Sequence, residues 1–385
     1  MNDLVPEADR HLNLDSLSDE VLSRVFGYLQ DSEQPHLIAS ITHHWREVAV
    51  GIPRLWTSVR ITHDRQVSVL QDILVRSKDF PLNIYIRLDA FRYRFCTEYS
   101  EAIDFLLPHS ARWRTLTIIA TNPVLHNIRN RIHRQALPAL ERLEIVQSDT
   151  GPIQHLGPFD FEPSVFRSLR LERTMIYAAD ATLLAGLTHI ELVESSLAML
   201  DEHKLLSAEY PTPEPRPPSM TALTHLVVDA SNPATDGLSY SPAFSATHLT
   251  SVSLARLGAP SMDLVQALSH VYGTALAAPA LRMLTIADIA DHALVMLLAI
   301  VRATRFPLLT RLSLAGIDTT TIDDRVVRAF AGGVSELVLA RLDPAPLATH
   351  LKDPDVWPAL ERIELDGTEV PRPKFVTLKA ASILQ

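Results

Sequence analysis

The feature that most constrains the fold is a pattern of apolar residues that recurs ten times. In each copy, apolar residues fill the first, fourth and sixth places of a six-residue stretch. The fourth places of successive copies lie 27, 26, 21, 36, 26, 32, 28, 25 and 26 residues apart. This spacing predicts a chain built from repeated units of one kind. The copies are WRTLTI (113–118), LERLEI (140–145), FRSLRL (166–171), LTHIEL (187–192), LTHLVV (223–228), LTSVSL (249–254), LRMLTI (281–286), LTRLSL (309–314), VSELVL (334–339) and LERIEL (360–365).

Each copy predicts a short strand, because alternate side chains of a strand point to opposite faces and the apolar ones can turn inward together. Helical spacing of apolar residues at 66–77, 262–279, 291–306 and 319–333 predicts helices that return the chain between strands. Burial of each apolar side chain contributes roughly 1.5–3 kcal/mol, but only where a neighbouring unit covers it. We therefore predict an α/β solenoid of stacked units.

A strand and a helix within about 25–30 residues resembles the leucine-rich repeat. Weaker copies, WTSVRI (56–61) and PLNIYI (81–86) with Pro81 in the first place, extend the pattern toward the N-terminus. Leucine-rich repeats often carry Asn three residues after the last apolar place, and this chain has no Asn there. The fold that we expect is therefore an irregular leucine-rich-repeat solenoid with the shape of an open arc.

Residues 17–56, in front of the repeats, carry more apolar surface than three short helices bury against one another. Ser18 is placed to cap the first helix, and a second helical run follows from Leu37 to Ala49. The apolar stripe is wider than one neighbour needs, so we expect both the rest of the chain and a second protein to cover it. The stripe on the first helix contains Leu17, Val21, Leu22, Val25, Phe26 and Leu29.

This layout resembles the F-box, a small all-α module of three helices. The family has a Leu-Pro-x-Glu start, an Ile/Val-Phe-x-x-Leu helix, a Cys-x-x-Trp-Arg stretch and a final Leu-Trp. Ser18 stands where the family usually has Pro, and Thr42 where it often has Cys. The matching residues are Leu17, Glu20, Val25-Phe26, Leu29, Trp45-Arg46 and Leu55-Trp56.

The resemblance implies docking on the Skp-family adaptor of cullin-RING ubiquitin ligases. It also implies that Trp45, Leu55 and Trp56 pack the module onto the first repeat. The alternative is a helical cap that only seals the end of the solenoid. The residues expected to face the adaptor are Leu17, Ser18, Val21, Leu22, Val25, Phe26, Leu29 and Ile41.

These patterns divide the chain into four segments. We expect a flexible N-terminus at 1–15, the F-box-like module at 16–56, the solenoid at 57–368 and a C-terminal tail or cap at 369–385. A proline-rich stretch at 211–219 falls in the widest gap of the repeat, which predicts an extended loop.

One surface of the solenoid is an obvious candidate for binding a target protein. It is formed by the residues beside the inward apolar places, which all point to the opposite face of the strands. His189 and His225 occupy equivalent places on successive strands. The alternative is an ordinary solvated face that binds nothing. The candidates form a mixed-charge patch (Arg142, Glu144, Arg170, Glu172, His189, Glu191), a nearly neutral stretch (Ser251, Ser253, Thr285, Ser313) and a charged end (Arg362, Glu364).

Composition and missing motifs argue against several classes of function. A net charge of −10 argues against binding nucleic acid, and a single cysteine excludes an internal disulfide. No apolar run is long enough to cross a membrane, and the first ten residues do not form a secretory signal. Gly-rich phosphate loops, nucleophile elbows and zinc motifs are absent, so we expect no cofactor, no metal and no catalysis.

The sequence thus predicts the substrate-recognition subunit of a Skp-cullin-F-box ubiquitin ligase, in the cytosol or nucleus. Its partners would be the Skp-family adaptor, through it the cullin and RING subunits, and an unknown target protein. The alternative is a non-catalytic repeat scaffold outside any ligase. An enzyme is the third possibility, without a motif in its favour.

Overall fold

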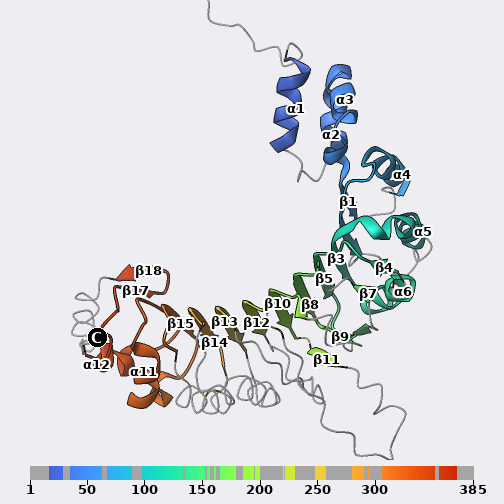
Figure 1. The fold of residues 1–385 in the computed structure, drawn as a ribbon. Coiled ribbons are helices and arrows are strands. Elements are labelled where there is room, and N and C mark those ends of the chain that lie inside the picture. Colours follow the sequence, from blue (N-terminus) through green and yellow to red (C-terminus); the bar gives the residue numbers. More distant parts are fainter. Residues whose placement is uncertain are drawn as a thin grey trace, which may run out of the picture. The chain divides into compact units, whose positions relative to one another are not determined.

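The computed structural model in Figure 1 divides into two compact units, residues 1–117 and 118–385, and each is described here by itself. The predicted border near residue 56 does not separate these units. The predicted N-terminal segment 1–15, the proline-rich loop 211–219 and residues 371–385 lie outside the described residues. The structure describes residues 17–28, 35–62, 67–88, 98–132, 135–151, 154–156, 160–161, 165–178, 185–194, 196–199, 220, 222–229, 248–256, 280–289, 294, 306–351 and 355–370.

The first unit begins with helices and continues with strands that alternate with helices. β1 and β2 pair in parallel, with Ser58 opposite Asn83 and Arg60 opposite Tyr85. The helix predicted at 66–77 is confirmed as α4. The elements are α1 (Asp19–Tyr28), α2 (Pro35–Ile41), α3 (His43–Val50), the 3-10 helix η2 (Pro53–Trp56), β1 (Ser58–Ile61), α4 (Val67–Arg76), β2 (Leu82–Leu88), α5 (Glu98–Leu106), the 3-10 helix η5 (Leu107–Arg112) and β3 (Trp113–Ala120), which runs across the division.

The two residues that depart from the F-box pattern each precede a helix. Ser18 Oγ lies 3.4 Å from the backbone nitrogen of Val21 in the first turn of α1. Thr42 is the N-cap of α3, and its Oγ1 accepts a hydrogen bond from the Trp45 amide at 3.1 Å. Small hydroxyl residues satisfy the unpaired amides of a first helical turn, which gives both departures a local structural reason.

One apolar cluster joins the helices of the first unit. It is built around Phe26, whose ring packs edge-on against Trp45 with centroids 5.3 Å apart. The Trp56 Nε1–H donates to the Ala49 carbonyl at 2.9 Å, and the Arg76 guanidinium lies over the Trp56 ring. The buried members are Leu22, Phe26, Ile38, Ala39, Val48, Ala49, Leu55 and Trp56, with Leu17, Trp45, Ile52 and Ile73 packed against them.

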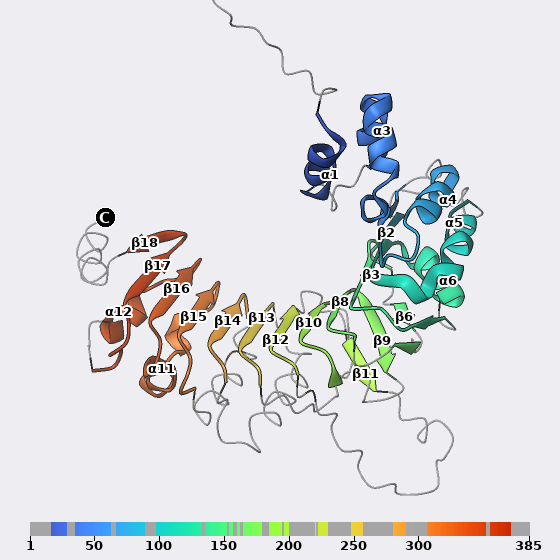
Figure 2. The same cartoon turned by 45° about the horizontal axis from the view of Figure 1, so that its top comes forward.

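The second unit is a row of parallel strands that lie side by side in chain order (Figure 2). They pair without a register shift, so equivalent residues of successive repeats lie opposite each other. This confirms a mixed α/β fold with a parallel sheet made of repeated units. The strands are β5 (Arg142–Gln147), β8 (Ser168–Glu172), β10 (His189–Val193), β12 (His225–Asp229), β13 (Ser251–Ala255), β14 (Met283–Ala287), β15 (Arg311–Ala315), β16 (Glu336–Ala340) and β17 (Arg362–Leu365).

The segments between these strands differ along the second unit. The helix predicted within 319–333 is confirmed as α11 (Asp324–Ala331), which follows the 3-10 helix η7 (Thr319–Thr321), and α12 (Ala345–Leu351) comes after β16. Between β8 and β12 the described residues include two further short strands, β9 (Thr174–Ala178) and β11 (Ser196–Met199). They pair with β6 (Gln154–Leu156) in a separate parallel sheet.

Other elements near the start of the second unit complete the list. α6 (Asn122–Ile132) precedes the two-residue strands β4 (Ala136–Leu137) and β7 (Asp160–Phe161), which pair in parallel. The predicted helix 262–279 and nearly all of 291–306 lie outside the described residues.

The repeated apolar residues form the core of the strand rows. Of the thirty residues in the ten copies, all but Leu365 are buried, and Leu365 lies on β17, the last parallel strand among the described residues. Pro81 is exposed, so placing it in the frame was wrong, and Leu82 is buried beside it.

A ladder of hydroxyl groups holds the strand starts together. Thr224 Oγ1 donates to the Thr188 carbonyl at 3.0 Å, and Thr250 Oγ1 donates to the Thr224 carbonyl at 3.0 Å. The same carbonyls also accept backbone amides from the next strand, so that Thr188 O accepts from both Thr224 N and His225 N. This ladder lies at the opposite ends of the strands from the turn where leucine-rich repeats often carry Asn. Thr310 and Ser335 repeat the contact.

The ends of the strands are held by residues in the left-handed conformation. Arg173, Glu194, Arg256, Asp288 and Arg341 have φ between 48° and 53°. The amides of the first four donate to the last carbonyl of the next strand, as in Arg256 N to Ala287 O at 2.9 Å, whereas Arg341 N donates to Asp366 Oδ1 at 2.8 Å. Each strand is thus tied to its neighbour at both ends.

The last strand turns back on itself. Asp366 and Gly367 have φ of 46° and 80°, which is the geometry of a two-residue hairpin turn. The turn places β18 (Thr368–Val370) antiparallel to β17, so Leu365 pairs with Thr368. The described start of the predicted C-terminal cap is therefore a strand at the sheet edge.

Candidate interaction surfaces

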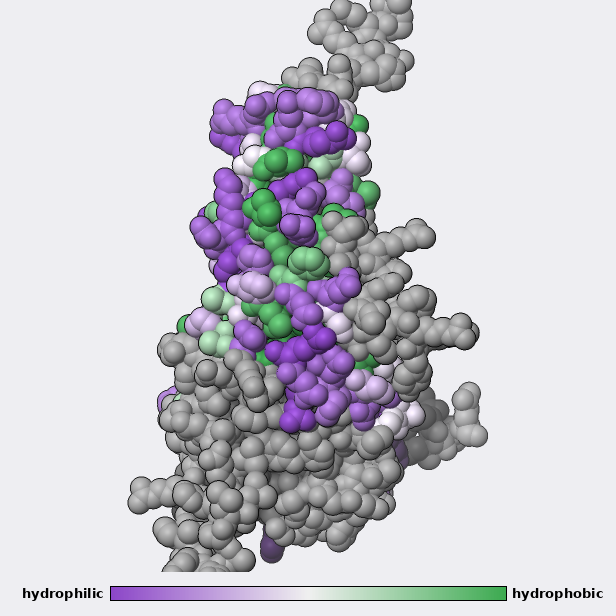
Figure 3. Space-filling view, turned by 90° about the vertical axis from the view of Figure 1, so that its right-hand side faces the viewer, coloured by the Kyte–Doolittle hydropathy of each residue, from purple (hydrophilic) through white to green (hydrophobic). Residues whose placement is uncertain are grey.

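The first candidate surface lies on α1 and α2. Val21 and Val25 are 44% and 42% exposed, and Tyr28, one turn further along the same face of α1, is 91% exposed. On α2, Leu37 and Ile41 are 52% and 55% exposed. Residues four apart lie on one side of a helix, so each helix presents an apolar stripe to solvent. Figure 3, which draws one side of the molecule, shows apolar surface between hydrophilic residues over the helices of the first unit.

The expectation that Leu22 and Phe26 face a partner needs correction. Both side chains have 0% exposure, because they fill the cluster between α1, α3 and η2. Leu17 is partly buried against the same cluster, and its carbonyl lies 3.2 Å from His44 Nε2. Ser18 is exposed and Leu29 lies outside the described residues. Of the predicted stripe on α1, Val21 and Val25 therefore face solvent, whereas Leu22 and Phe26 face the cluster.

Three residues were expected to pack the helices onto the first repeat. Leu55 and Trp56 are fully buried and Trp45 is partly buried in the cluster that also contacts Ile73 of α4. These residues therefore connect α1–α3 to the helix that follows β1.

The second candidate surface is the face of the second unit's strands that points away from the apolar core. Its residues form straight rows across the strands, because the registers are unshifted. The central row contains most of the predicted residues: Glu144, Arg170, Glu191, Val227, Ser253, Thr285, Ser313, Val338 and Glu364. A parallel row contains Arg142, Ser168, His189, His225, Ser251, Met283, Arg311, Glu336 and Arg362.

The predicted mixed-charge patch is one connected network around Arg170. Its guanidinium lies 3.5 Å from Glu144, 3.2 Å from Glu172 and 3.5 Å from Glu191. Partial burial opposes the positive charge, but the hydrogen bond to Glu172 and the charges of Glu191 and Glu144 outweigh it and raise the pKa of Arg170. One cation thus holds three carboxylates on three neighbouring strands.

His189 and His225 are direct cross-strand neighbours, with ring centroids 5.7 Å apart. Burial lowers the pKa of His189, and His225 and Arg142 lower it further, while Glu191 acts in the opposite direction. Within the described part of the chain, no three His, Cys, Asp or Glu side chains are grouped to hold a metal ion. The lowered pKa favours the neutral form of His189.

The neutral stretch and the charged end differ from the prediction in two respects. Met283 lies between Ser251 and Arg311 and is 40% exposed, so the stretch carries a flexible apolar side chain that the search for small residues missed. Glu336 lies between Arg311 at 3.2 Å and Arg362 at 3.5 Å. Arg362 lies eight strand steps from Arg142, roughly 40 Å along the row, so these candidates form separate patches.

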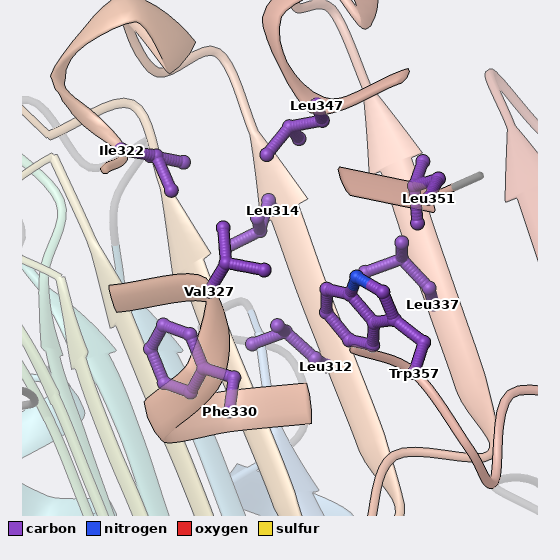
Figure 4. A pocket seen from close by; sticks show the side chains of 9 residues that line it. All are labelled: Leu312, Leu314, Ile322, Val327, Phe330, Leu337, Leu347, Leu351 and Trp357. Atoms are coloured by element: carbon purple, nitrogen blue, oxygen red, sulfur yellow. The ribbon is translucent and has the colours of Figure 1, made fainter. Parts of the chain in front are cut away.

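A pocket beside β15 and β16 is part of the core. Figure 4 shows Leu312, Leu314 and Leu337 from the strands facing Val327 and Phe330 of α11, with Trp357 beside them. All nine lining residues are apolar or aromatic. Nothing in the lining selects a ligand, so we do not regard this pocket as a site.

Among the described residues, no helix has the length and apolar character that a membrane span requires.

Comparison with known proteins gives a limited result. No family model matches the chain, and no curated protein matches it. A solved structure titled "Crystal structure of Rad7 and Elc1 complex in yeast" contains a chain that is similar over 83% of this chain and 88% of its own length. The identity is 15% and the TM-score is 0.37. At this level, the likeness carries no conclusion about partners or activity.

Proposed function

We propose that this chain is the substrate-recognition subunit of a Skp-cullin-F-box ubiquitin ligase. In this proposal α1–α3 dock on the Skp-family adaptor, which links the chain to the cullin and RING subunits. The strand rows bind a target protein, and the chain itself catalyses nothing. We expect it to act in the cytosol or nucleus, where such a complex would meet its targets.

The observation that carries the proposal is the division of apolar residues on α1. Leu22 and Phe26 complete the internal cluster, whereas Val21 and Val25 remain exposed beside them. A helix that only sealed the end of a solenoid would need the first pair and gain nothing from the second. An apolar stripe on a rigid, internally packed helix is a common way of entering a partner's groove.

The proposal is tested by co-purification of the intact chain with the Skp-family adaptor. A Val21→Asp, Val25→Asp double variant places two carboxylates on the exposed stripe without touching the cluster. We expect it to recover at least about ten-fold less adaptor than the unmodified chain, because charged groups in an apolar interface are costly.

α4 offers a matched control with the same chemical change. Val69 and Val75 are also exposed valines on a helix of the first unit, and a Val69→Asp, Val75→Asp variant should recover the adaptor normally. Equal recovery by all three proteins, or none by any of them, would contradict the proposal. A Leu22→Asp, Phe26→Asp variant is unsuitable, because it would disrupt the cluster itself.

A non-catalytic repeat scaffold with a helical cap is the second candidate. It is favoured by one observation, the packing of Ile73 of α4 against the same cluster as Leu22 and Phe26. Helices that share a core with the first repeat can serve as its seal. In that case no Skp-family adaptor is recovered, and removal of α1–α3 destabilises the first unit.

A further inference from the structure

The strands of the first unit carry a different charge pattern from the strands that follow. The sequences of β1, β2 and β3 contain three arginines and no Asp or Glu. By contrast, β5, β8 and β10 contain Glu144, Glu172 and Glu191. In a chain with a net charge of −10, three adjacent strands whose charged side chains are all arginines are a distinct local surface.

The three arginines lie along one line on the solvent-facing side of β2. This side presents Asn83, Tyr85 and Arg87, while Ile84 and Ile86 between them are buried. The Arg60 guanidinium stacks on the Tyr85 ring at 4.6 Å from its centroid. The Arg114 Nε–H donates to Asn83 Oδ1 at 3.2 Å. Positive charge therefore lies beside each of three alternate positions of one strand.

The spacing of this line matches an extended peptide. Alternate residues of a strand are about 7 Å apart, and so are the side chains on one side of any extended segment. Acidic residues at alternate positions of such a segment would each meet one guanidinium. Arginine binds carboxylates through charge-assisted hydrogen bonds, and stacking on Tyr85 holds Arg60 in a fixed orientation.

The same spacing disfavours two other anions. A single phosphoryl group is bound best where several guanidiniums converge on it, whereas here they are distributed along a strand. A nucleic acid depends on many phosphate contacts, which three cations in an acidic chain do not supply.

We propose that the face formed by Arg60, Asn83, Tyr85, Arg87 and Arg114 binds an extended segment of a partner protein with Asp or Glu at alternate positions. This rests on the proposed function, because it assigns a class of target to the receptor. It places the recognition of that target on the first unit, outside the mixed-charge patch of the second.

The test uses the purified full chain and a fluorescent peptide, Gly-Asp-Ser-Asp-Ser-Asp-Gly, with binding followed by anisotropy at two salt concentrations. We expect binding that weakens as salt rises. Arg87→Glu and Arg114→Glu, both at exposed positions, should each weaken it about ten-fold or more. Arg325→Glu and Arg328→Glu make the same charge change at exposed positions of α11, outside both candidate surfaces, and should change affinity less than about two-fold.

Three outcomes overturn the proposal. The first is no binding by the unmodified chain, and the second is an equal loss in the control variants. The third is binding through Arg87 and Arg114 of a singly phosphorylated Gly-Ser peptide or of an RNA 12-mer, while the Asp peptide remains unbound. The peptide assay does not contain the adaptor, so a failure to bind the peptide would leave the co-purification result unchanged. Failure of co-purification likewise leaves peptide binding to be measured.

Discussion

The helical segment and the strand rows use apolar residues in different ways. In the repeat copies 29 of 30 apolar places are buried, whereas on α1 two apolar residues are buried and three large ones remain at the surface. A strand in a row has a neighbour on either side, and the next unit covers its inward residues. α1 is covered along one face only. The difference shows that coverage by neighbours, rather than residue type, decides which apolar side chains remain exposed.

Leu365 supports this interpretation within the strand rows themselves. It occupies the same place in its repeat as Leu339, and the two are direct register partners. Leu339 is fully buried, but Leu365 is only partly buried because β18 follows it in place of another full unit. The predictions below test how far this distinction holds.

The largest expected effect is on the cluster of the helical segment. Phe26→Ala should lower the free energy of unfolding of the first unit by about 3–5 kcal/mol, because it removes a fully buried aromatic ring. Tyr28→Ala, at an exposed position two residues away, should change it by less than about 0.5 kcal/mol. Denaturant unfolding followed by tryptophan fluorescence measures both. Similar losses would show that α1 is not divided into a buried and an exposed face.

A comparison of two leucines tests the end of the strand rows. Leu339→Ala should cost about 2–5 kcal/mol, and Leu365→Ala about half as much, because part of the Leu365 side chain is already in contact with solvent. Denaturation midpoints of the two variants give the ratio. If the two losses were the same, the last repeat would be as well covered as the interior ones.

Gly316 tests how tightly the strand ends are packed. Arg173 and Arg341 adopt the same left-handed conformation, so the backbone alone does not require glycine at this point. A Cβ on Gly316 would clash with Asp288 Oδ1, and Oδ2 of the same carboxylate pairs with the Arg341 guanidinium at 2.7 Å. Gly316→Ala should therefore cost about 1–3 kcal/mol.

Two further variants separate crowding from backbone strain at Gly316. Adding Asp288→Ala to Gly316→Ala should restore most of the lost stability, because the clash disappears and an exposed ion pair contributes little. Gly332→Ala is the matched control, since no atom lies within 4 Å of its added Cβ and its φ is −60°. Thermal unfolding measures all three, and a double variant as unstable as the single one would assign the cost to the backbone.

The smallest expected effect is the pH dependence from His189. The pKa of His189 is lowered below its ordinary 6.5 by burial and by His225. The unfolded chain therefore binds more protons in this range, and the contribution to stability is complete above pH 6.5 and is lost as the pH falls below it. The unfolding midpoint of the His189→Gln variant should decrease less than that of the unmodified chain when the pH is lowered from 7.5 to 5.5. An identical pH profile for the two proteins would contradict the expected role of the histidine pair.

Much of the strand region could be predicted from residue spacing. The apolar places of LTHLVV and LTRLSL identified both the strands and their buried sides, because strand geometry leaves alternate residues no other arrangement. The same alternation placed Glu144, Arg170 and Glu191 in one row. The number of charges around Arg170 was not predictable, because it depends on unshifted registers between strands that are 21 to 26 residues apart in the sequence.

The candidate docking surface was predicted less accurately. Helical periodicity placed Val21, Leu22, Val25 and Phe26 on one stripe, but it did not show which half would face α3 and η2. The arginine line on β2 was missed as well, because Arg60 and Arg114 reach it from neighbouring strands. Their individual sequences show only isolated basic residues.

The sequence by itself determined the repeated strands, their inward faces and the excess of apolar surface in front of them. Each of these follows from the period of side-chain direction along a single element. The tertiary structure alone decided which apolar residues remain at the surface, which charges meet across strands and which side chain crowds Gly316. These features depend on contacts between residues far apart in the chain. A local sequence pattern does not show which distant residues will be in contact with it.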